Sequence, residues 1–212
     1  MEYVDLSRYV YSTSLVPMQN LGWLGTSAGI QGGSEPPVTP VEAKALERAS
    51  KWLSAVTLGV HECEFCPPGR THSGNGEFHY YSAGGDTYAA PALINHYVRD
   101  HGYRPPLIFR AAALSECPLV WDRRADFLAA ALADDTVDFE LRCEAVVDIA
   151  YWADRRSLEM LERAACDAEI SDIAGREIGI SLRRVLQGMP GSMLSISLDR
   201  LAPDVRAGLV DE

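Results

Sequence analysis

The chain has 212 residues, is 47% hydrophobic and carries 30 acidic against 19 basic side chains, for a formal net charge of −11. This length and composition allow a sizeable buried core, whereas the acidic balance disfavours nucleic-acid binding, which depends on neutralising phosphates. No apolar run approaches the roughly 20 residues that span a bilayer, and the start (MEYVDLSRYV) lacks the features of a secretory signal, so we expect a cytoplasmic protein without membrane contact.

The N-terminal residues 1–24 mix aromatic and polar positions without helical periodicity and indicate an extended arm or edge strand. Residues 25–39 are rich in glycine, serine and proline and indicate a loop. A helix is predicted to follow, because Thr39 is a good N-cap, Pro40 suits the first helical position and Glu42 completes a capping box. Apolar residues at helical spacing extend this predicted helix to Val56.

The segment after this helix has the pattern of a β-hairpin followed by two helices. Residues 77–82 and 87–90 flank the turn Ala-Gly-Gly-Asp at 83–86, which predicts the hairpin. One helix is predicted to begin at Pro91 and to end at Gly102, a residue that favours the helix C-terminus. Another is predicted from Pro105-Pro106 to about Leu114.

After Cys117 the pattern becomes entirely helical. Helices are predicted at about 122–133, 138–152, 155–167 and 171–187, and the tail from Gly188 is expected to be strand or coil. The sequence therefore predicts an α+β fold with two parts, an α/β-hairpin module at 1–117 and an all-α module at 118–212. Short paired helices suit either stacked HEAT-like repeats or an ordinary small bundle. Residues 121–212 hold 19 acidic and 11 basic side chains, a net charge of −8.

Two cysteines and two histidines have the spacing of a zinc site. Cys63-x2-Cys66 is followed, after 29 residues, by His96-x4-His101. A short Cys-x2-Cys turn presents two thiolates, and a histidine pair near a helix end supplies two further ligands. Because residues five apart lie about 140° apart around a helix, the last helical turn must loosen for both imidazoles to converge. Four protein ligands would make such an ion structural.

Other arrangements remain open at this stage. His61 or His79 could replace one of the two histidine ligands, or the cysteines could be a buried pair without metal. A redox role is disfavoured, because the Pro-Pro-Gly run at 67–69 blocks a following helix. A zinc ion lacking its fourth protein ligand, surrounded by His61, His79 and Glu77, would instead suit a metal-dependent enzyme acting on a small molecule.

Several short motifs allow comparison with known families. Those in the first part are YVDLS (3–7), LGWL (21–24), HECEFC (61–66), GNGE (74–77), YAAP (88–91) and INHYVRDHGYRPP (94–106). They resemble a family of bacterial, mainly actinobacterial, proteins with no assigned activity. In the second part, LERAACD (161–167) and IAGREIGISL (173–182) are similar to short HEAT-type helical proteins found among bacterial toxin-immunity proteins. This second resemblance implies a helical module that binds and neutralises a toxin.

Together these features predict a non-enzymatic protein-binding protein with a structural zinc site. Its acidic second part suits a basic protein partner, such as a toxin with nuclease activity, because opposite charges steer association. The alternatives are the metal-dependent enzyme and a zinc-stabilised adaptor that contacts a partner through the tyrosines of the hairpin, Tyr80, Tyr81 and Tyr88.

Overall fold

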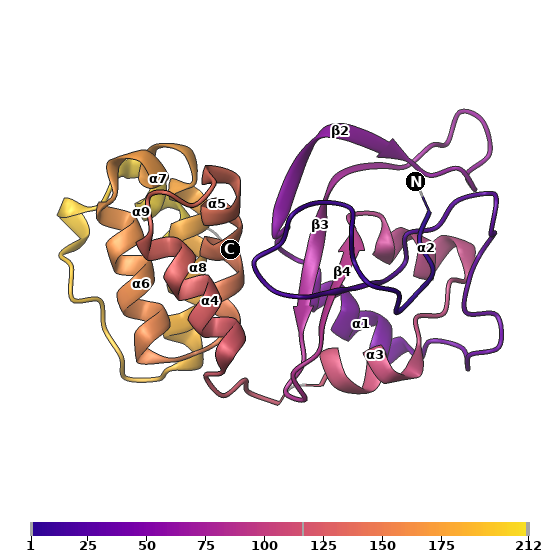
Figure 1. Cartoon of the computed structure of the whole chain (residues 1–212), viewed down its shortest axis with the longest axis horizontal. Helices are drawn as coiled ribbons and strands as arrows, with labels where there is room; N and C mark the ends of the chain where they lie inside the picture. The colour runs from indigo at the N-terminus through magenta and orange to yellow at the C-terminus, as the bar shows by residue number, and fades with distance from the viewer. Residues whose placement is uncertain (1, 116, 211–212) are drawn as a thin grey trace. The chain divides into compact units, whose positions relative to one another are not determined.

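The chain divides into two compact units, residues 1–117 (the first unit) and 118–212 (the second unit) (Figure 1). The computed structural model describes residues 2–115 and 117–210, without the side chain of Leu58. The first unit contains a sheet and helices, whereas the second unit contains helices, so the predicted α+β class is confirmed. Every helix in the described ranges is too short or too polar to cross a membrane.

The first unit is built on one small sheet. Its strands are β1 (Gln19–Asn20), β2 (Ala55–Glu62), β3 (Ser73–Tyr81) and β4 (Thr87–Pro91). Among the described residues they lie in the order β1-β4-β3-β2, with β2, β3 and β4 antiparallel and β1 parallel to β4. The predicted hairpin is confirmed, since the Ser82 N–H donates to the Asp86 carbonyl at 3.0 Å across the turn. The predicted edge strand in the N-terminal arm is β1.

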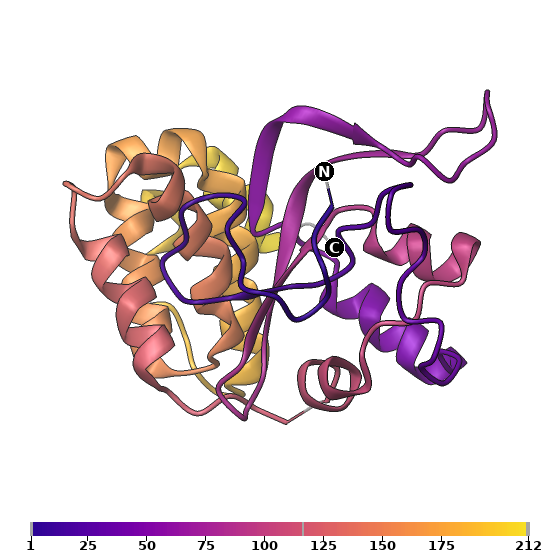
Figure 2. The ribbon, with the colours of Figure 1, turned by 45° about the vertical axis from the view of Figure 1, so that its right-hand side comes forward.

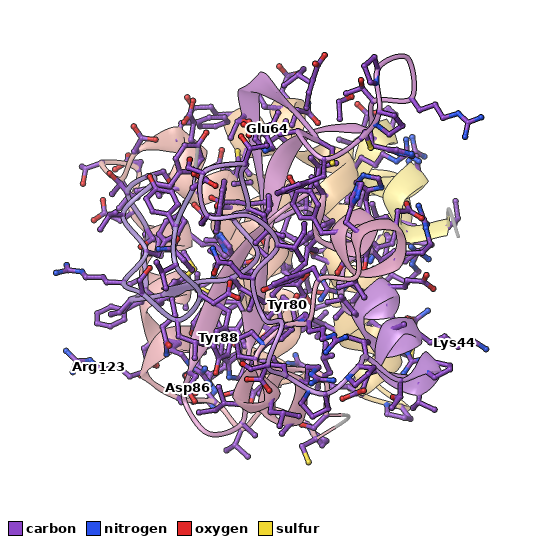
Figure 3. The ribbon with its side chains drawn as sticks, turned by 90° about the vertical axis from the view of Figure 1, so that its right-hand side faces the viewer. Lys44, Glu64, Tyr80, Asp86, Tyr88 and Arg123 are labelled. Carbon is purple, nitrogen blue, oxygen red and sulfur yellow. The ribbon has the colours of Figure 1, made fainter. Side chains whose placement is uncertain are left out.

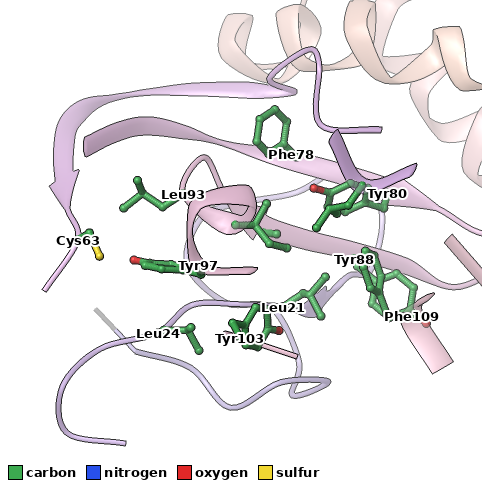
Figure 4. Packing of buried hydrophobic residues seen from close by; sticks show 13 residues of the cluster. Leu21, Leu24, Cys63, Phe78, Tyr80, Tyr88, Leu93, Tyr97, Tyr103 and Phe109 are labelled. Carbon is green, nitrogen blue, oxygen red and sulfur yellow. The ribbon is translucent and has the colours of Figure 1, made fainter. Parts of the chain in front are cut away.

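Three helices gather on one side of this sheet (Figure 2). They are α1 (Pro40–Ala49), α2 (Ile94–His101) and α3 (Leu107–Ala113). The core includes Tyr80 and Tyr88 from the strands, Tyr97 from α2 and Phe109 from α3 (Figure 4). Leu46 from α1 belongs to the same cluster. Burial of these large side chains stabilises this unit.

Two helix boundaries in the first unit differ from the prediction. The helix expected to reach Val56 ends at Ala49, where Ser50 caps it by donating its N–H and Oγ–H to the Leu46 carbonyl. Residues from Ala55 onward instead pair with β3, as in the Val56–Gly76 pair. The helix expected to begin at Pro91 begins at Ile94, because residues 87–91 complete the β3–β4 pairing. In both places, strand pairing overrides the local helical pattern.

The second unit is a set of helices with short connections. They are α4 (Arg123–Ala133), α5 (Phe139–Asp148), the 3-10 turn η1 (Ile149–Tyr151), α6 (Arg155–Cys166), α7 (Ala168–Ile173), α8 (Gly175–Gly188), the 3-10 turn η2 (Leu198–Arg200) and α9 (Pro203–Val210). The first three predicted helices are confirmed. The fourth, predicted at 171–187, is in fact α7 and α8, separated at Ala174. The HEAT-like organisation of this unit stays a prediction.

The C-terminal tail, expected to be strand or coil, contains α9, which packs closely against α8. A Cβ atom added to Gly179 of α8 would lie 2.1 Å from the Val205 carbonyl oxygen, and one added to Gly208 of α9 would lie 2.1 Å from the Arg176 carbonyl oxygen. The backbones of α8 and α9 therefore come close together at Gly179 and Gly208, where neither helix carries a side chain. The prediction missed α9 because this short helix depends on its contact with α8.

Asp167 joins α6 to α7 and contributes to the stability of the second unit. Its Oδ1 accepts the backbone N–H groups of Glu169 at 3.0 Å and Ile170 at 3.1 Å, and its Oδ2 accepts from Arg142 Nη2 at 3.0 Å. The Ile170 N–H and then the Arg142 guanidinium outweigh partial burial and lower the pKa of Asp167. A lowered pKa in the folded state means that Asp167 stabilises the fold when it is ionised.

Replacing Asp167 with alanine is expected to lower the free energy of unfolding at pH 7 by about 1–2 kcal/mol, through loss of the helix cap. Asp167→Asn, which keeps an acceptor oxygen for the cap, should lose less. The contribution is complete above the unfolded-state pKa near ~3.9 and is lost as the pH falls through the lower folded-state value. Urea unfolding followed by circular dichroism at pH 7 and pH 3 would test this, and a difference between wild type and Asp167→Ala that is equal at both pH values would contradict it.

Candidate metal centre

The four residues singled out by their spacing lie together in the first unit. Cys63 follows β2 directly, Cys66 lies in the loop between β2 and β3, and His96 and His101 belong to α2. One donor atom from each lies within 4.8 Å of all the others. Cys63 is buried at the end of the hydrophobic core, beside Tyr97 (Figure 4). These residues could therefore hold a metal ion, as the sequence predicted.

The distances between donor atoms resemble the edges of a zinc tetrahedron. Usual zinc bonds at tetrahedral angles place sulfur and nitrogen about 3.6 Å apart and two nitrogens about 3.3 Å apart. Here Cys63 Sγ–His101 Nε2 and Cys66 Sγ–His96 Nε2 are both 3.3 Å, Cys66 Sγ–His101 Nε2 is 3.5 Å, and the two Nε2 atoms are 3.0 Å apart. These donor types and distances are compatible with a shared metal ion at the centre of the four side chains.

The C-terminal end of α2 has the loosened turn that two histidines five residues apart require. The Gly102 N–H bonds to the Tyr97 carbonyl, five residues earlier, and the Tyr103 N–H bonds to the same carbonyl at 3.0 Å. This wider turn brings His96 and His101 to one face of the helix. Gly102 ends the helix with φ +70°, a left-handed conformation that glycine adopts without strain. The predicted loosening is confirmed.

The loop that carries the cysteines is shaped by backbone hydrogen bonds. The Cys63 N–H donates to the His72 carbonyl at 2.8 Å, which closes the base of the loop. Burial raises the pKa of the Cys63 thiol, while the backbone N–H groups of Phe65 and Cys66 act in the opposite direction. A thiolate in this position therefore has backbone donors, and a cation would supply the remaining compensation for burial.

His96 has partners at both ring nitrogens. Its Nδ1 lies 2.7 Å from Asp100 Oδ2, one helical turn later. Burial lowers the pKa of His96 and favours the neutral ring, the form that ligates metals. Arg99 donates to the Asp100 carboxylate, which holds the pKa of Asp100 well below its usual range.

Sequence reasoning missed His72 and Asp100 as neighbours of the cluster. The exposed His72 ring stacks on the His96 ring with centroids 4.1 Å apart and planes 29° apart. His72, His96 and Asp100 also have donor atoms within 4.8 Å of one another. The position of Asp100 four residues after His96 was the available signal, since side chains at that spacing meet on a helix.

The other candidate ligands lie outside the four-residue cluster. His61 lies on β2, where its Nε2 is 3.3 Å from the Tyr97 hydroxyl. His79 lies on β3, with Nε2 3.7 Å from Glu77 Oε1. Glu77 accepts from the Tyr9 hydroxyl at 2.7 and 2.9 Å. In the part of the chain that the structure describes, His61, Glu77 and His79 are therefore not brought around the cysteines as a three-ligand enzyme site would require.

Two hairpin tyrosines expected to offer a contact surface are buried instead. Tyr80 is 1% exposed and Tyr88 is 0% exposed. The Tyr80 hydroxyl pairs with Ser50 Oγ at 2.7 Å, and both rings pack against Phe109. The expectation that these two tyrosines contact a partner in an adaptor is therefore wrong, because alternation along β3 and β4 directs them into the core.

The loop of the cluster is also connected to the N-terminal part of the unit. The surface carboxylate of Glu64 (Figure 3), between the two cysteines, accepts the backbone N–H and the hydroxyl of Thr26, both at 2.9 Å. The cluster region thus joins three segments that lie far apart in sequence, namely the loop after residue 24, the β2–β3 loop and α2.

Comparison with curated proteins and with solved structures gives no match. A family model described as "Domain of unknown function (DUF7919)" matches residues 1–114. The match includes all four cluster residues and covers more than half of the chain. The chain therefore belongs to the DUF7919 family.

Proposed function

We propose that the chain is a non-enzymatic protein-binding protein whose first unit is stabilised by one structural zinc ion. The observation that carries this proposal is the convergence of four donor atoms, from Cys63, Cys66, His96 and His101, within 4.8 Å of one another. Four protein ligands complete a tetrahedral shell and leave no position for a reacting water molecule. A site of this kind supplies folding energy rather than chemistry.

The donor types favour zinc over the common hard cations. Thiolate sulfur and imidazole nitrogen bind zinc well, whereas magnesium and calcium prefer oxygen ligands. The cluster offers two sulfurs and two nitrogens at its centre, and the nearby Asp100 oxygen faces the outer nitrogen of His96. Purified protein should therefore contain about one zinc ion per chain, as measured by elemental analysis.

The charge of the second unit supports a basic protein as the partner. Exposed acidic side chains gather at the α4–α5 connection and in the first turn of α5, and these are Asp134, Asp135, Asp138 and Glu140. An acidic surface attracts a basic protein and raises its association rate. The resemblance of this part to HEAT-type immunity proteins points in the same direction. Charge and resemblance together support the proposal of a cytoplasmic protein that neutralises a basic bacterial toxin.

An affinity capture with the zinc-loaded full-length chain would test this partner. We expect an extract of the native host to yield a basic protein whose affinity falls several-fold as salt rises, and whose toxic activity is inhibited by equimolar chain. The double variant Asp135→Asn/Glu140→Gln should weaken this binding, whereas Glu47→Gln/Glu62→Gln, an equal charge change on exposed residues of the first unit, should not. Salt-independent binding, or equal effects of both variants, would refute the proposed partner.

A further inference from the structure

The two histidines of the cluster differ in the partners of their ring nitrogens. His96 Nε2 faces the cluster, 3.3 Å from Cys66 Sγ, while its Nδ1 is held at 2.7 Å by Asp100 Oδ2. For His101, the hydrogen-bond-range partners among the described residues are the cluster atoms themselves, Cys63 Sγ, Cys66 Sγ and His96 Nε2. One imidazole therefore has a dedicated carboxylate partner and the other does not.

Asp100 is itself held in place. Arg99 donates from Nε to Oδ1 at 3.0 Å and from Nη2 to Oδ2 at 2.8 Å, so both carboxylate oxygens have a donor. Paired guanidinium–carboxylate contacts of this kind fix orientation as well as charge. The stacked His72 ring, 4.1 Å from the His96 ring, restricts the imidazole from a further side.

We propose that Asp100 is a positioning residue of the metal site, an inference that rests on the proposed function. By accepting the Nδ1–H of His96, Asp100 selects the tautomer in which the Nε2 lone pair faces the ion. The opposite tautomer would present an N–H group to the ion and could not ligate it. Carboxylate partners of this type also make the ligating nitrogen more basic, and their loss typically weakens metal affinity by about 10–100-fold.

Zinc competition against a chromophoric chelator would measure this effect in the full-length chain. Asp100→Ala removes the acceptor and should weaken zinc binding by about 10–100-fold. Asp100→Asn keeps an acceptor oxygen without the charge and should lie between Asp100→Ala and wild type. Glu47→Gln is the matched control, because Glu47 also acts electrostatically on Arg99 but lies on α1. Its affinity should stay within about twofold of wild type.

Nitrogen-15 NMR of the zinc-loaded proteins gives a second readout that a general loss of stability would not change. In wild type, the His96 Nδ1–H proton should be shifted downfield and should exchange slowly with water. In Asp100→Ala, it should move upfield and exchange faster, while the His101 ring signals stay in place. Glu47→Gln should retain the wild-type signal.

The outcomes separate this inference from the proposed function. If wild type takes up no zinc, the structural zinc site is refuted, and the role of Asp100 with it. If wild type binds zinc and Asp100→Ala binds equally tightly with an unchanged Nδ1–H signal, only the positioning role of Asp100 is overturned. Weaker zinc binding together with the altered signal supports both.

Discussion

Removing zinc from the full-length protein is expected to unfold the first unit while α4–α9 of the second unit stay folded. Structural zinc contributes an apparent ~10–16 kcal/mol in small zinc domains, comparable with the whole stability of a typical domain, about 5–15 kcal/mol. Here the ion would connect the β2–β3 loop to α2, and Glu64 extends that connection to Thr26. Without it, the Sγ atoms of Cys63 and Cys66 and the Nε2 atoms of His96 and His101 would face one another with no shared cation to hold the loop against the helix.

Hydrogen exchange measured by mass spectrometry would follow this change by segment. After chelation, peptides spanning residues 25–33, 60–72 and 94–104 should exchange much faster, and peptides spanning residues 155–188 should keep their protection. Cys63→Ser should reproduce the effect without a chelator. Cys143→Ser is the control, because it makes the same substitution in α5 of the second unit, away from the cluster. Burial raises the pKa of the Cys143 thiol to about 11, so this thiol is neutral at pH 7. Unchanged exchange in residues 60–104 after complete zinc removal would contradict a structural role for the ion.

The second large effect is expected at Phe109, where α3 meets the sheet. Its side chain is 0% exposed, and its ring makes edge contacts with Tyr80 and Tyr88, with both centroid distances 5.2 Å. Phe109→Ala should lower the free energy of unfolding by about 3–5 kcal/mol, since it removes buried surface and leaves a cavity between two rigid rings. Urea unfolding in zinc-containing buffer, followed by far-ultraviolet circular dichroism, would measure the loss.

Two further variants test whether the loss of stability comes from the buried volume at Phe109. Phe109→Leu keeps much of the buried volume and should lose less than Phe109→Ala. Phe127→Ala, on α4 where the residue is 40% exposed, should lose clearly less stability than Phe109→Ala. A loss below about 1 kcal/mol for Phe109→Ala would mean that α3 contributes little to the core.

Local sequence signals predicted a helix boundary where the contacts that set it lie within about one helical turn, as at the start of α1 and at Gly102 after α2. The capping box at Thr39 and Glu42 places the start of α1 correctly, because those contacts lie within one helical turn. The end of α1 depends on β2 pairing with β3, and α9 depends on the close approach of Gly179 and Gly208. Neither contact leaves a periodic pattern in its own segment, so neither could be predicted from it.

The candidate metal ligands were predictable for a different reason. Thiolates and imidazoles at short spacings are uncommon enough in sequence to indicate their shared chemistry, even across 29 intervening residues. The surroundings of the site were not predictable in this way. Stacking of His72 on His96 depends on how the β2–β3 loop folds back, and the burial of Tyr80 and Tyr88 depends on which sheet face the helices cover.

The beginning and the end of the first unit are joined by one carboxylate. Asp5 Oδ1 accepts the Gly22 N–H at 2.8 Å, and both Asp5 oxygens accept from the Tyr103 hydroxyl at 3.1 Å. Contacts so distant in sequence slow folding, because a long chain segment must be ordered before they form. During synthesis, this connection cannot form until Tyr103 has left the ribosome. Until then the strands of the nascent chain expose unpaired edges, to which chaperones or other chains can bind.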